Sequence, residues 1–236
     1  MSQTPLSYRI VQAGDQAVTL DYGNLIDPAI NCEVIAWFNA FQQQPLPGVI
    51  EMVPAYSSLT FYYDIIKVRQ LYSTKTTAAE TISIELEKRL QHLPLSADIP
   101  RRLMRIPVCY EPPYAMDMKA MIQGTGLTAE AIIQRHTATT YQVYMLGFLP
   151  GFAYMGEVNN SIAMPRKSQP VFVPAGSVGI AGKQTGVYSF PSPGGWMIIG
   201  RTPLQLFRAN TAVPALLHAG DSVQFYSISR DEFDSY

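Results

Sequence analysis

Apolar residues follow two periodicities in the first ninety residues, and each predicts one kind of secondary structure. Recurrence every three or four positions predicts helices at 28–44 and 77–90. Asp27 can cap the first helix, and Pro28 occupies the first helical position, which tolerates proline. Short β-type runs predict strands at 8–11, 17–21, 49–53 and 59–63. This order predicts a two-layer α+β sandwich with helices on one face of a small sheet.

A segment bracketed by prolines, at 93–100, ends this region. Its composition is typical of a linker or of a loop that enters a new domain. We therefore predict an α+β domain at 1–96 and a second domain at 97–236.

The second domain begins with one strand and two helices and then becomes β-rich. Alternating apolar residues predict a strand at 104–110, and helical spacing predicts helices at 116–123 and 129–136. Thr128 can cap the second of these helices. After residue 141 the only further helix predicted is a short one at 213–217.

Glycines recur between Gly176 and Gly200 and separate short apolar runs. Glycine is used where the backbone takes a positive φ or approaches another backbone closely. The runs at 178–181, 187–190 and 196–199 are predicted strands, and the tight corners between them are typical of a small closed or nearly closed β barrel. The expected fold class is thus α+β, with a two-layer domain followed by a β barrel.

Charge and composition exclude several classes of protein. The chain has 17 basic and 18 acidic residues and no run of five like charges. It therefore lacks the charge pattern typical of proteins that bind nucleic acid or an anionic membrane. No apolar run approaches the length of a membrane span, and the first residues lack a secretory signal, so we expect a cytoplasmic protein. Cys32 and Cys109 share no CxxC spacing, and we expect buried free thiols.

Gly182-Lys183 raises the question of phosphate binding. A P-loop would place glycine at 177 and Ser or Thr at 184, where this chain has Ser177 and Gln184. Backbone amides on a glycine-permitted curve, together with one lysine, can still hold an anion without that motif. The alternative is that Lys183 lies at a hairpin tip and faces solvent.

Arg166 and Arg201 flank the same glycine-rich stretch, and a guanidinium binds carboxylate or phosphate with two parallel hydrogen bonds. Convergence of these two arginines and Lys183 would form an anion site. Each arginine could instead form a surface ion pair or hold loop carbonyl groups. Nearby aromatic residues, Phe148 among them, could line a pocket or an interface, or could belong to the core.

Two other kinds of site are disfavoured. The three histidines, His92, His136 and His218, have no second histidine or carboxylate at metal-ligand spacing, so we expect no metal site. The chain lacks the Gly-x-Ser-x-Gly elbow of a serine hydrolase. His136 ends a predicted helix, which favours a structural role.

Several motifs resemble those of one known family. They are VYMLGFLPGF at 143–152, VPAGSVGIAG at 173–182, QTG at 184–186, SPGGW at 192–196 and GRTP at 200–203. Short N-terminal segments at 14–15, 46–48 and 53–59 are similar too. By these motifs the chain is identified as a member of the KipI and PxpB family, also called allophanate hydrolase subunit 1.

The resemblance implies a fold and a function. The fold would be an α+β N-terminal domain followed by a cyclophilin-like barrel. The function would be that of the B component of an ATP-dependent 5-oxoprolinase, an amidohydrolase component that is inactive alone and needs PxpC-like and PxpA-like partners, with ATP and its Mg as the only cofactor. Alternatives within the family are a KipI-type inhibitor of a sensor histidine kinase and a carboxyltransferase component of allophanate hydrolase or urea carboxylase type.

Ring opening of a lactam builds negative charge on oxygen, which preorganised amides and cations would stabilise. The resulting candidate catalytic residues are His136, Lys183 and Arg201. The candidates for binding substrate or anion are Arg166, Gly182, Gln184, Thr185, Phe148 and Gly151.

Overall fold

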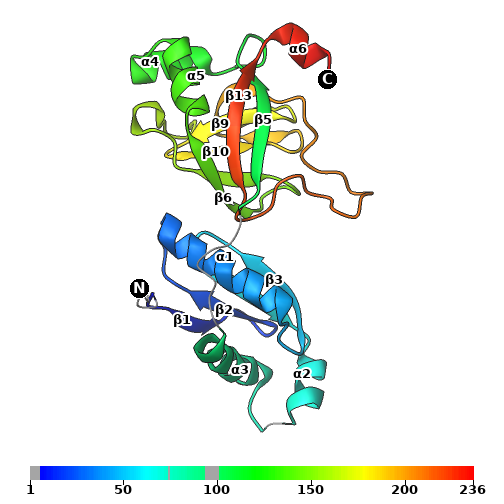
Figure 1. Cartoon of the computed structure of the whole chain (residues 1–236). Helices are drawn as coiled ribbons and strands as arrows, with labels where there is room; N and C mark the ends of the chain where they lie inside the picture. The colour runs from blue at the N-terminus through cyan, green and yellow to red at the C-terminus, as the bar shows by residue number, and fades with distance from the viewer. Residues whose placement is uncertain (1–5, 74, 94–100) are drawn as a thin grey trace. The chain divides into compact units, whose positions relative to one another are not determined.

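A computed structural model describes residues 6–73, 75–93 and 101–236. The chain divides into two compact units, one up to Pro100 and one from Arg101. The boundary that we predicted at 96–97 lies outside the described residues. Figure 1 shows the element labels used below.

The first unit is a four-stranded antiparallel sheet with strand order β1-β2-β4-β3. Leu20 of β2 pairs with Leu59 of β4, and both are fully buried. The same core includes buried helical residues, among them Val34, Val68 and Ile82, so helices cover this face of the sheet. This is the predicted two-layer arrangement. The strands are β1 (Arg9–Gln12), β2 (Ala17–Asp21), β3 (Val49–Pro54) and β4 (Ser58–Tyr63).

The described part of this unit contains three helices, α1 (Pro28–Gln43), α2 (Ile65–Tyr72) and α3 (Ala78–His92). Helices α1 and α3 were predicted. The carboxylate of Asp27 accepts hydrogen bonds from the backbone N–H groups of residues 29 and 30, which confirms the predicted cap of α1. Helix α2 was not predicted, and its N-cap is Asp64. A capping box of Thr77 and Glu80 begins α3.

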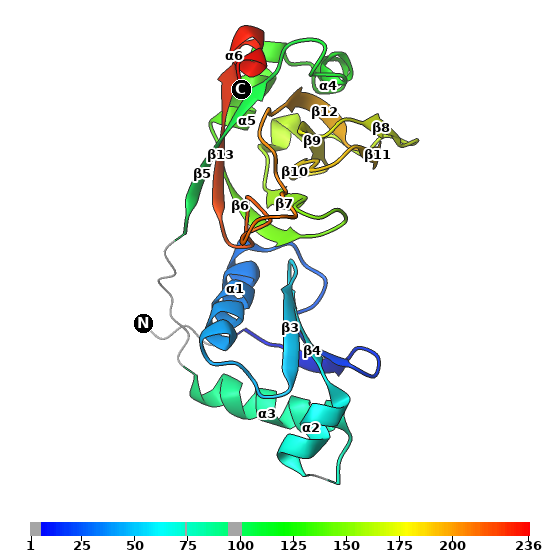
Figure 2. The same ribbon diagram turned by 90° about the vertical axis from the view of Figure 1, so that its right-hand side faces the viewer.

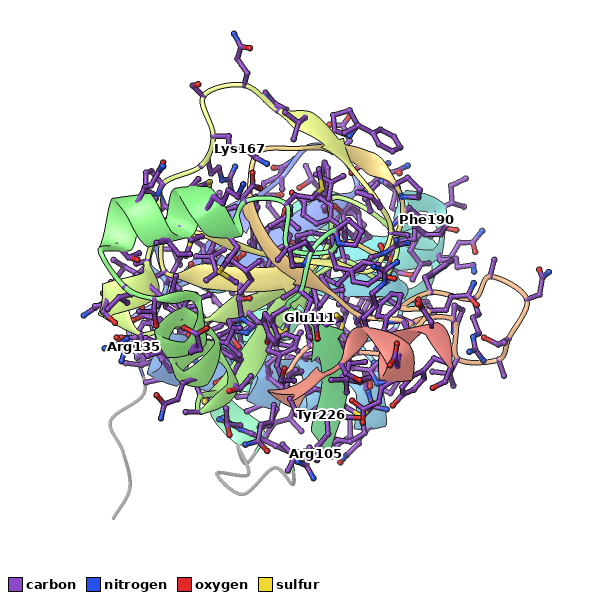
Figure 3. All side chains as sticks on the ribbon, turned by 90° about the horizontal axis from the view of Figure 1, so that it is seen from above. Arg105, Glu111, Arg135, Lys167, Phe190 and Tyr226 are labelled. Carbon is purple, nitrogen blue, oxygen red and sulfur yellow. The ribbon has the colours of Figure 1, made fainter. Side chains whose placement is uncertain are left out.

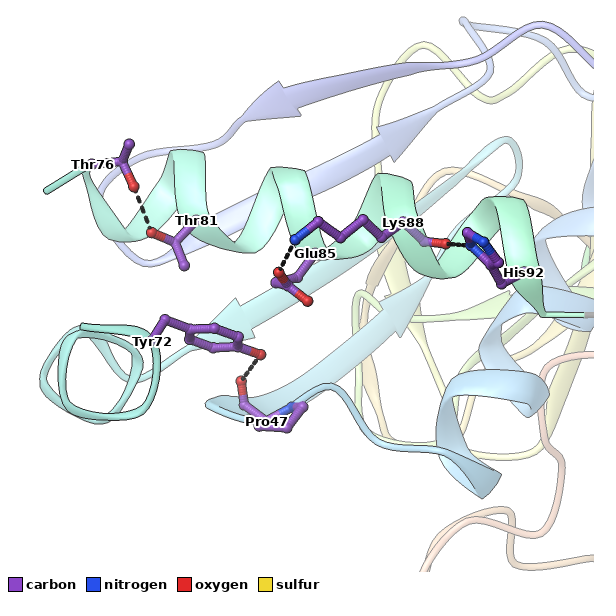
Figure 4. Close-up of polar contacts among 7 residues, drawn as sticks. All are labelled: Pro47, Tyr72, Thr76, Thr81, Glu85, Lys88 and His92. Atoms are coloured by element: carbon purple, nitrogen blue, oxygen red, sulfur yellow. Dashed lines mark hydrogen bonds and ion pairs between the residues drawn. The ribbon is translucent and has the colours of Figure 1, made fainter. Parts of the chain in front are cut away.

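Polar contacts hold α3 and its surroundings in place (Figure 4). Lys88 Nζ lies 2.7 Å from Glu85 Oε1, one turn away. His92 Nδ1 lies 2.7 Å from the carbonyl oxygen of Lys88 in the last turn of the helix. The hydroxyl of Tyr72, at the end of α2, donates to the carbonyl of Pro47 at 3.2 Å.

The second unit contains a closed barrel with strand order β10-β7-β6-β13-β5-β12-β9. Strands β5 and β13 are parallel and lie side by side in both Figure 1 and Figure 2. A separate pair, β8 (Val171–Val173) and β11 (Ser192–Gly194), accompanies the barrel. The barrel strands are β5 (Leu103–Cys109), β6 (Thr140–Leu146), β7 (Ala153–Gly156), β9 (Ser177–Ala181), β10 (Gln184–Val187), β12 (Met197–Arg201) and β13 (Ser222–Ile228).

Helices α4 (Met118–Thr125) and α5 (Ala129–Thr137) confirm two predictions, and Thr128 caps α5 as expected. The predicted helix at 213–217 is wrong, because Ala215 instead forms a β-bridge with Phe207. The predicted strand at 187–190 is displaced, since β10 ends at Val187. A 3-10 turn at 160–162 and the short helix α6 (Arg230–Asp234) were not predicted.

Two apolar clusters form in the second unit. The larger fills the barrel and includes Val178, Ile180 and Val187. A smaller one contains Phe152, Tyr188 and Trp196 and is described below. Of the two cysteines, Cys109 is buried and Cys32 is half-buried. None of the described helices has the length and apolar character needed to cross a membrane.

Candidate functional site

Trp196 packs on the outer face of the barrel because two strands present glycine there. Val178 and Ile180 of β9 point into the barrel core, so the residue between them, Gly179, faces outward. A Cβ at Gly179 would lie 3.0 Å from the Trp196 Cβ, and one at Gly186 would lie 3.0 Å from the indole ring. The glycines therefore leave a flat backbone surface on which the aromatic ring rests.

Aromatic rings gather around Trp196 in edge-to-face contacts. The ring of Phe152 lies 5.5 Å from that of Trp196 and 5.1 Å from that of Tyr188, with interplanar angles above 80°. Tyr154 packs 4.8 Å from Phe152. Such pairs contribute about 0.5–1.5 kcal/mol each beyond the area that they bury. We call this group the outer cluster: Phe152, Tyr154, Val173, Ala181, Tyr188, Trp196 and Ile198.

Two predicted site residues belong to the loop that precedes β7. Phe148 has a positive φ of 68°, is 62% exposed, and lies with its ring 5.7 Å from Phe152. Gly151 has φ 78°, and a Cβ there would lie 2.9 Å from the Cβ of Phe207. Gly151 thus allows the loop to pack closely, while Phe148 extends from the outer cluster into solvent.

Arg166 is the predicted cation that lies at the outer cluster. Its guanidinium carbon is 5.9 Å from the centre of the Trp196 ring, and the side chain is exposed. Among the described residues it has no hydrogen-bond or ion-pair partner. Burial raises the pKa of the Tyr154 hydroxyl, and the positive charge of Arg166 opposes that rise. Arg166 therefore presents an exposed guanidinium beside the outer cluster, a group whose shape suits carboxylate or phosphate.

A half-buried ion pair fixes the backbone beside Arg166. Lys167 Nζ lies 2.7 Å from Asp117 Oδ2, and the same oxygen accepts a hydrogen bond from the backbone N–H of Ile198 at 2.7 Å. The Lys167 N–H donates to the carbonyl of Gly195 at 2.7 Å. Lys167 is labelled in Figure 3. These contacts hold the segment of Arg166 against the start of β12.

Lys183 lies in the turn between β9 and β10, as expected for the solvent-facing alternative. Gly182 makes the turn with φ 58° and donates its N–H to the carbonyl of Met164 at 2.6 Å. Lys183 Nζ is 3.7 Å from Glu157 Oε2, and both side chains are exposed. Gln184 follows as the first residue of β10.

Arg201 lies at the opposite end of β9 from Lys183. It pairs with Ser177, the first residue of that strand, and its Nε donates to the carbonyl of Ala175 at 2.7 Å. At roughly 3.3 Å per strand residue, Ser177 and Lys183 are about 15–20 Å apart. The predicted convergence of all three cations is therefore not what the structure shows. Arg201 is a clamp on a loop carbonyl, which was the alternative hypothesis.

His136 and Thr185 meet inside the barrel, and both are fully buried. The Thr185 hydroxyl donates to the carbonyl of Gly179 at 3.1 Å, so its oxygen accepts from His136 Nε2 at 2.9 Å. Nδ1 then lacks a proton and accepts a hydrogen bond from the Tyr110 hydroxyl at 2.8 Å. The network assigns the Nε2–H tautomer of a neutral imidazole.

Burial lowers the pKa of His136 to about 3, so the ring stays neutral in the folded protein. It also stacks on Phe225 with ring centres 4.7 Å apart. A fully buried, fully bonded histidine fits the structural role that the sequence left open. Thr185 has the same surroundings and completes this network.

Two features of the site were not predicted from the sequence: the role of Tyr110 and the ion pair of Asp117 with Lys167. Tyr110 alternates with Ile106 and Val108, so the period-two pattern alone places its side chain inside the barrel. The ion pair of Asp117 with Lys167 joins residues fifty positions apart, and no local pattern indicates it. Within the described part of the chain, no three His, Cys, Asp or Glu side chains form a metal-binding group.

Known proteins resemble this chain over most of its length. Residues 8–217 match the family described as "Carboxyltransferase domain, subdomain C and D". The 5-oxoprolinase subunit designated B in Bacillus subtilis is 42% identical over 97% of this chain and 96% of its own length. The protein of the same name from Haemophilus influenzae is 38% identical over 80% of this chain and 84% of its own length. Both likenesses extend over the two units.

A solved structure, that of TTHA0988, has the same fold with a TM-score of 0.77 and 32% identity. The match covers 91% of this chain but 40% of TTHA0988. The match thus spans less than half the length of TTHA0988.

Proposed function

The chain belongs to the family of carboxyltransferase domains of subdomain C and D, and from that premise we propose that it is the B component of an ATP-dependent 5-oxoprolinase. The observation that carries this proposal is the 42% identity, over nearly the full length of both proteins, to the 5-oxoprolinase subunit designated B in Bacillus subtilis. The reaction would hydrolyse 5-oxoproline to glutamate. A PxpC-like and a PxpA-like protein would be its partners.

The substrate chemistry suits the outer cluster. 5-Oxoproline is a small ring with one carboxylate and one lactam group. During hydrolysis water adds to the lactam carbon, the carbon–nitrogen bond breaks, and the nitrogen takes up a proton. The guanidinium of Arg166, which lies against the buried Trp196 ring, would bind the substrate carboxylate.

The predicted cations do not converge on one anion site in the described part of this chain. The sequence lacks a P-loop, Lys183 points toward Glu157, and Arg201 holds a backbone carbonyl at the other end of β9. We propose that ATP and its Mg are bound by a partner or at a site shared with one. Calorimetric titration of ATP into the isolated chain should then give no binding, whereas the assembled complex should bind it.

The test of the main proposal is ATP-dependent ring opening. The purified chain is assayed for glutamate formation from 5-oxoproline, alone and mixed with the PxpA-like and PxpC-like proteins of the same genome. Glutamate should form only in the full mixture and only with ATP. A mixture that assembles but forms no glutamate would overturn the proposal.

The family description favours one second candidate, a carboxyltransferase component. Such a protein would take a carboxyl group from carboxybiotin, so its activity would depend on a biotin-bearing protein. The same assay separates the two candidates, because a carboxyltransferase would form no glutamate from 5-oxoproline.

A further inference from the structure

Cys109 is fully buried although its side chain faces away from the barrel core. Its sequence neighbours Val108 and Tyr110 belong to the apolar cluster inside the barrel, so Cys109, between them, faces outward. Helix α6 contacts β5 and lies at the end of the barrel where β5 ends (Figures 1 and 2). Burial raises the pKa of the Cys109 thiol; the nearby carboxylate of Asp234 adds to that rise, and Arg230 opposes it. Helix α6 therefore covers this thiol.

Arg201 lies under the same helix. It is the cross-strand neighbour of Cys109, so both side chains share the outer face of the barrel. The guanidinium carbon lies 6.0 Å from the centre of the Phe233 ring of α6. Nε donates to the carbonyl of Ala175, and among the described residues the two terminal nitrogens have no hydrogen-bond partner. The helix thus lies over a cation that keeps unused hydrogen-bond donors.

The attachment of α6 to the barrel is weak. Within this helix, which the structure describes in full, every residue except Phe233 is exposed. Phe233 packs on Tyr114 with ring centres 4.2 Å apart, and the Tyr114 hydroxyl donates to Asp234 at 3.0 Å. Arg230 Nε lies 3.8 Å from Asp234 Oδ2, in an exposed pair of a kind that contributes about 0–1 kcal/mol. Opening of α6 should therefore cost less free energy than unfolding of the barrel.

The closed helix and a bound anion would compete for the surface of Arg201. The sequence of α6, RDEFD, contains three acidic residues and one arginine. A carboxylate or phosphate approaching Arg201 would meet this negative charge as well as the Phe233 ring. Opening of the helix removes both obstacles and presents the terminal nitrogens for two parallel hydrogen bonds to an anion. A ligand that binds only the open form raises the population of that form.

We propose that α6 is an autoinhibitory cap, which opens away from the barrel and so frees the terminal nitrogens of Arg201 to bind a carboxylate or phosphate group. Cys109 lies beneath the same cap, so exposure of its thiol reports the opening. The proposal does not depend on the proposed 5-oxoprolinase activity, because opening and anion binding are properties of this chain alone.

Thiol labelling of the full chain measures the opening. In a Cys32→Ser background Cys109 is the remaining cysteine, and its reaction with dithionitrobenzoate is followed without denaturant. Phe233→Ala removes the ring that holds the cap and should raise the labelling rate at least tenfold. The matched control is Phe207→Ala, because Phe207 is also half-buried and packs on an aromatic ring, that of Phe190, elsewhere in the second unit. The control should label within twofold of the parent protein.

Urea distinguishes opening of the cap from unfolding of the barrel. Labelling through the cap should be almost independent of urea below the unfolding transition, because the opening exposes little surface. A labelling rate that rises with urea as steeply as global unfolding does would overturn the proposal. A Phe233 variant that labels no faster than the parent protein would overturn it too.

Inorganic phosphate tests the link between the cap and Arg201. Phosphate should accelerate labelling of Cys109 at least threefold relative to sodium chloride of the same ionic strength, because it binds the open form. Arg201→Gln should abolish that acceleration, whereas Arg208→Gln, at an exposed arginine of the same unit, should retain it. Acceleration that survives Arg201→Gln, or no acceleration in the parent protein, would overturn the autoinhibitory role of α6. Neither result would bear on the proposed 5-oxoprolinase activity.

Discussion

At the scale of single residues, His136 shows how burial decides the role of a titratable group. Its imidazole is enclosed in the barrel, bonded at both nitrogens by Tyr110 and Thr185, and has its pKa lowered to about 3 by burial. Protonation would place a charge in an apolar core and would convert Nδ1 from an acceptor into a donor facing the Tyr110 hydroxyl. The neutral ring is therefore part of the folded state.

The stability of the barrel should depend on pH through this histidine. In the unfolded chain a histidine takes up a proton below about pH 6.5, whereas His136 in the folded protein does so only near pH 3. The stabilisation is therefore complete above pH 6.5 and is lost as the pH falls, by about 1.4 kcal/mol of unfolding free energy per pH unit.

Urea unfolding between pH 7 and pH 5 measures this slope. A Trp37→Phe background leaves Trp196 as the tryptophan reporter of the barrel. His136→Gln in that background should be less stable at pH 7 and should have the shallower profile, since the remaining titrating groups are common to both proteins. Equal slopes for the two proteins would contradict the assignment of a buried neutral His136.

Glycine at position 186 gives a second prediction at this scale. A Cβ there would lie 2.9 Å from the carbonyl oxygen of Ala153 and 3.0 Å from the Trp196 ring, so Gly186→Ala should destabilise the barrel by about 1–3 kcal/mol. The matched control is Gly195→Ala, whose Cβ would meet nothing closer than 3.6 Å. Chemical denaturation of both variants, followed by Trp196 fluorescence, tests the difference. A Gly195 variant as unstable as the Gly186 variant would refute the explanation by close packing.

At the scale of elements, Asp117 connects three segments that are distant in sequence. Its carboxylate binds Lys167 and the N–H of Ile198, and so ties the start of α4 to β12 and to the segment of Arg166. Asp117→Ala would leave a half-buried ammonium and a backbone donor without their partner. We expect a loss of roughly 1–3 kcal/mol in unfolding free energy and a raised KM for 5-oxoproline in the reconstituted complex.

Glu85→Ala is the matched control for this prediction. Glu85 also binds a lysine at 2.7 Å, but Lys88 is well exposed and the pair spans one helical turn. Exposed pairs of this kind contribute little to stability. If the two variants lose the same stability, the role of Asp117 as a connection between segments is wrong.

The elements also show what the sequence could and could not predict. Helix α1 has a cap, a permitted proline and a regular apolar stripe, so local residues alone specified its start. The segment at 213–217 has an apolar composition, but its pairing with Phe207 depends on a neighbour in space and not on its own spacing. Likewise, the glycines of β9 and β10 indicated a barrel correctly, yet only the folded sheet reveals that they accommodate Trp196.

At the scale of the whole molecule, the three predicted cations, Arg166, Lys183 and Arg201, lie in different places and make different contacts. Lys183 and Arg201 were grouped in the sequence because both border glycine-rich turns, but the register of β9 with β12 places them at opposite ends of a strand. Strand register follows from pairing across the barrel and is not encoded in the spacing of single residues. Arg166 alone of the three lies at the outer cluster without a bonded partner among the described residues.

Substitutions at these cations should therefore differ in the reconstituted 5-oxoprolinase. Arg166→Ala should raise the KM for 5-oxoproline on the order of 10–100-fold, because a charged hydrogen bond to a carboxylate contributes about 1.5–3 kcal/mol. Arg166→Lys should recover part of that loss, since it keeps the charge but not the planar fork. Lys183→Ala should change the KM less than threefold, because its side chain is exposed and its nearest carboxylate is 3.7 Å away. Steady-state kinetics on the full mixture measure all three variants, and a larger effect at Lys183 than at Arg166 would move the proposed carboxylate site to the turn between β9 and β10.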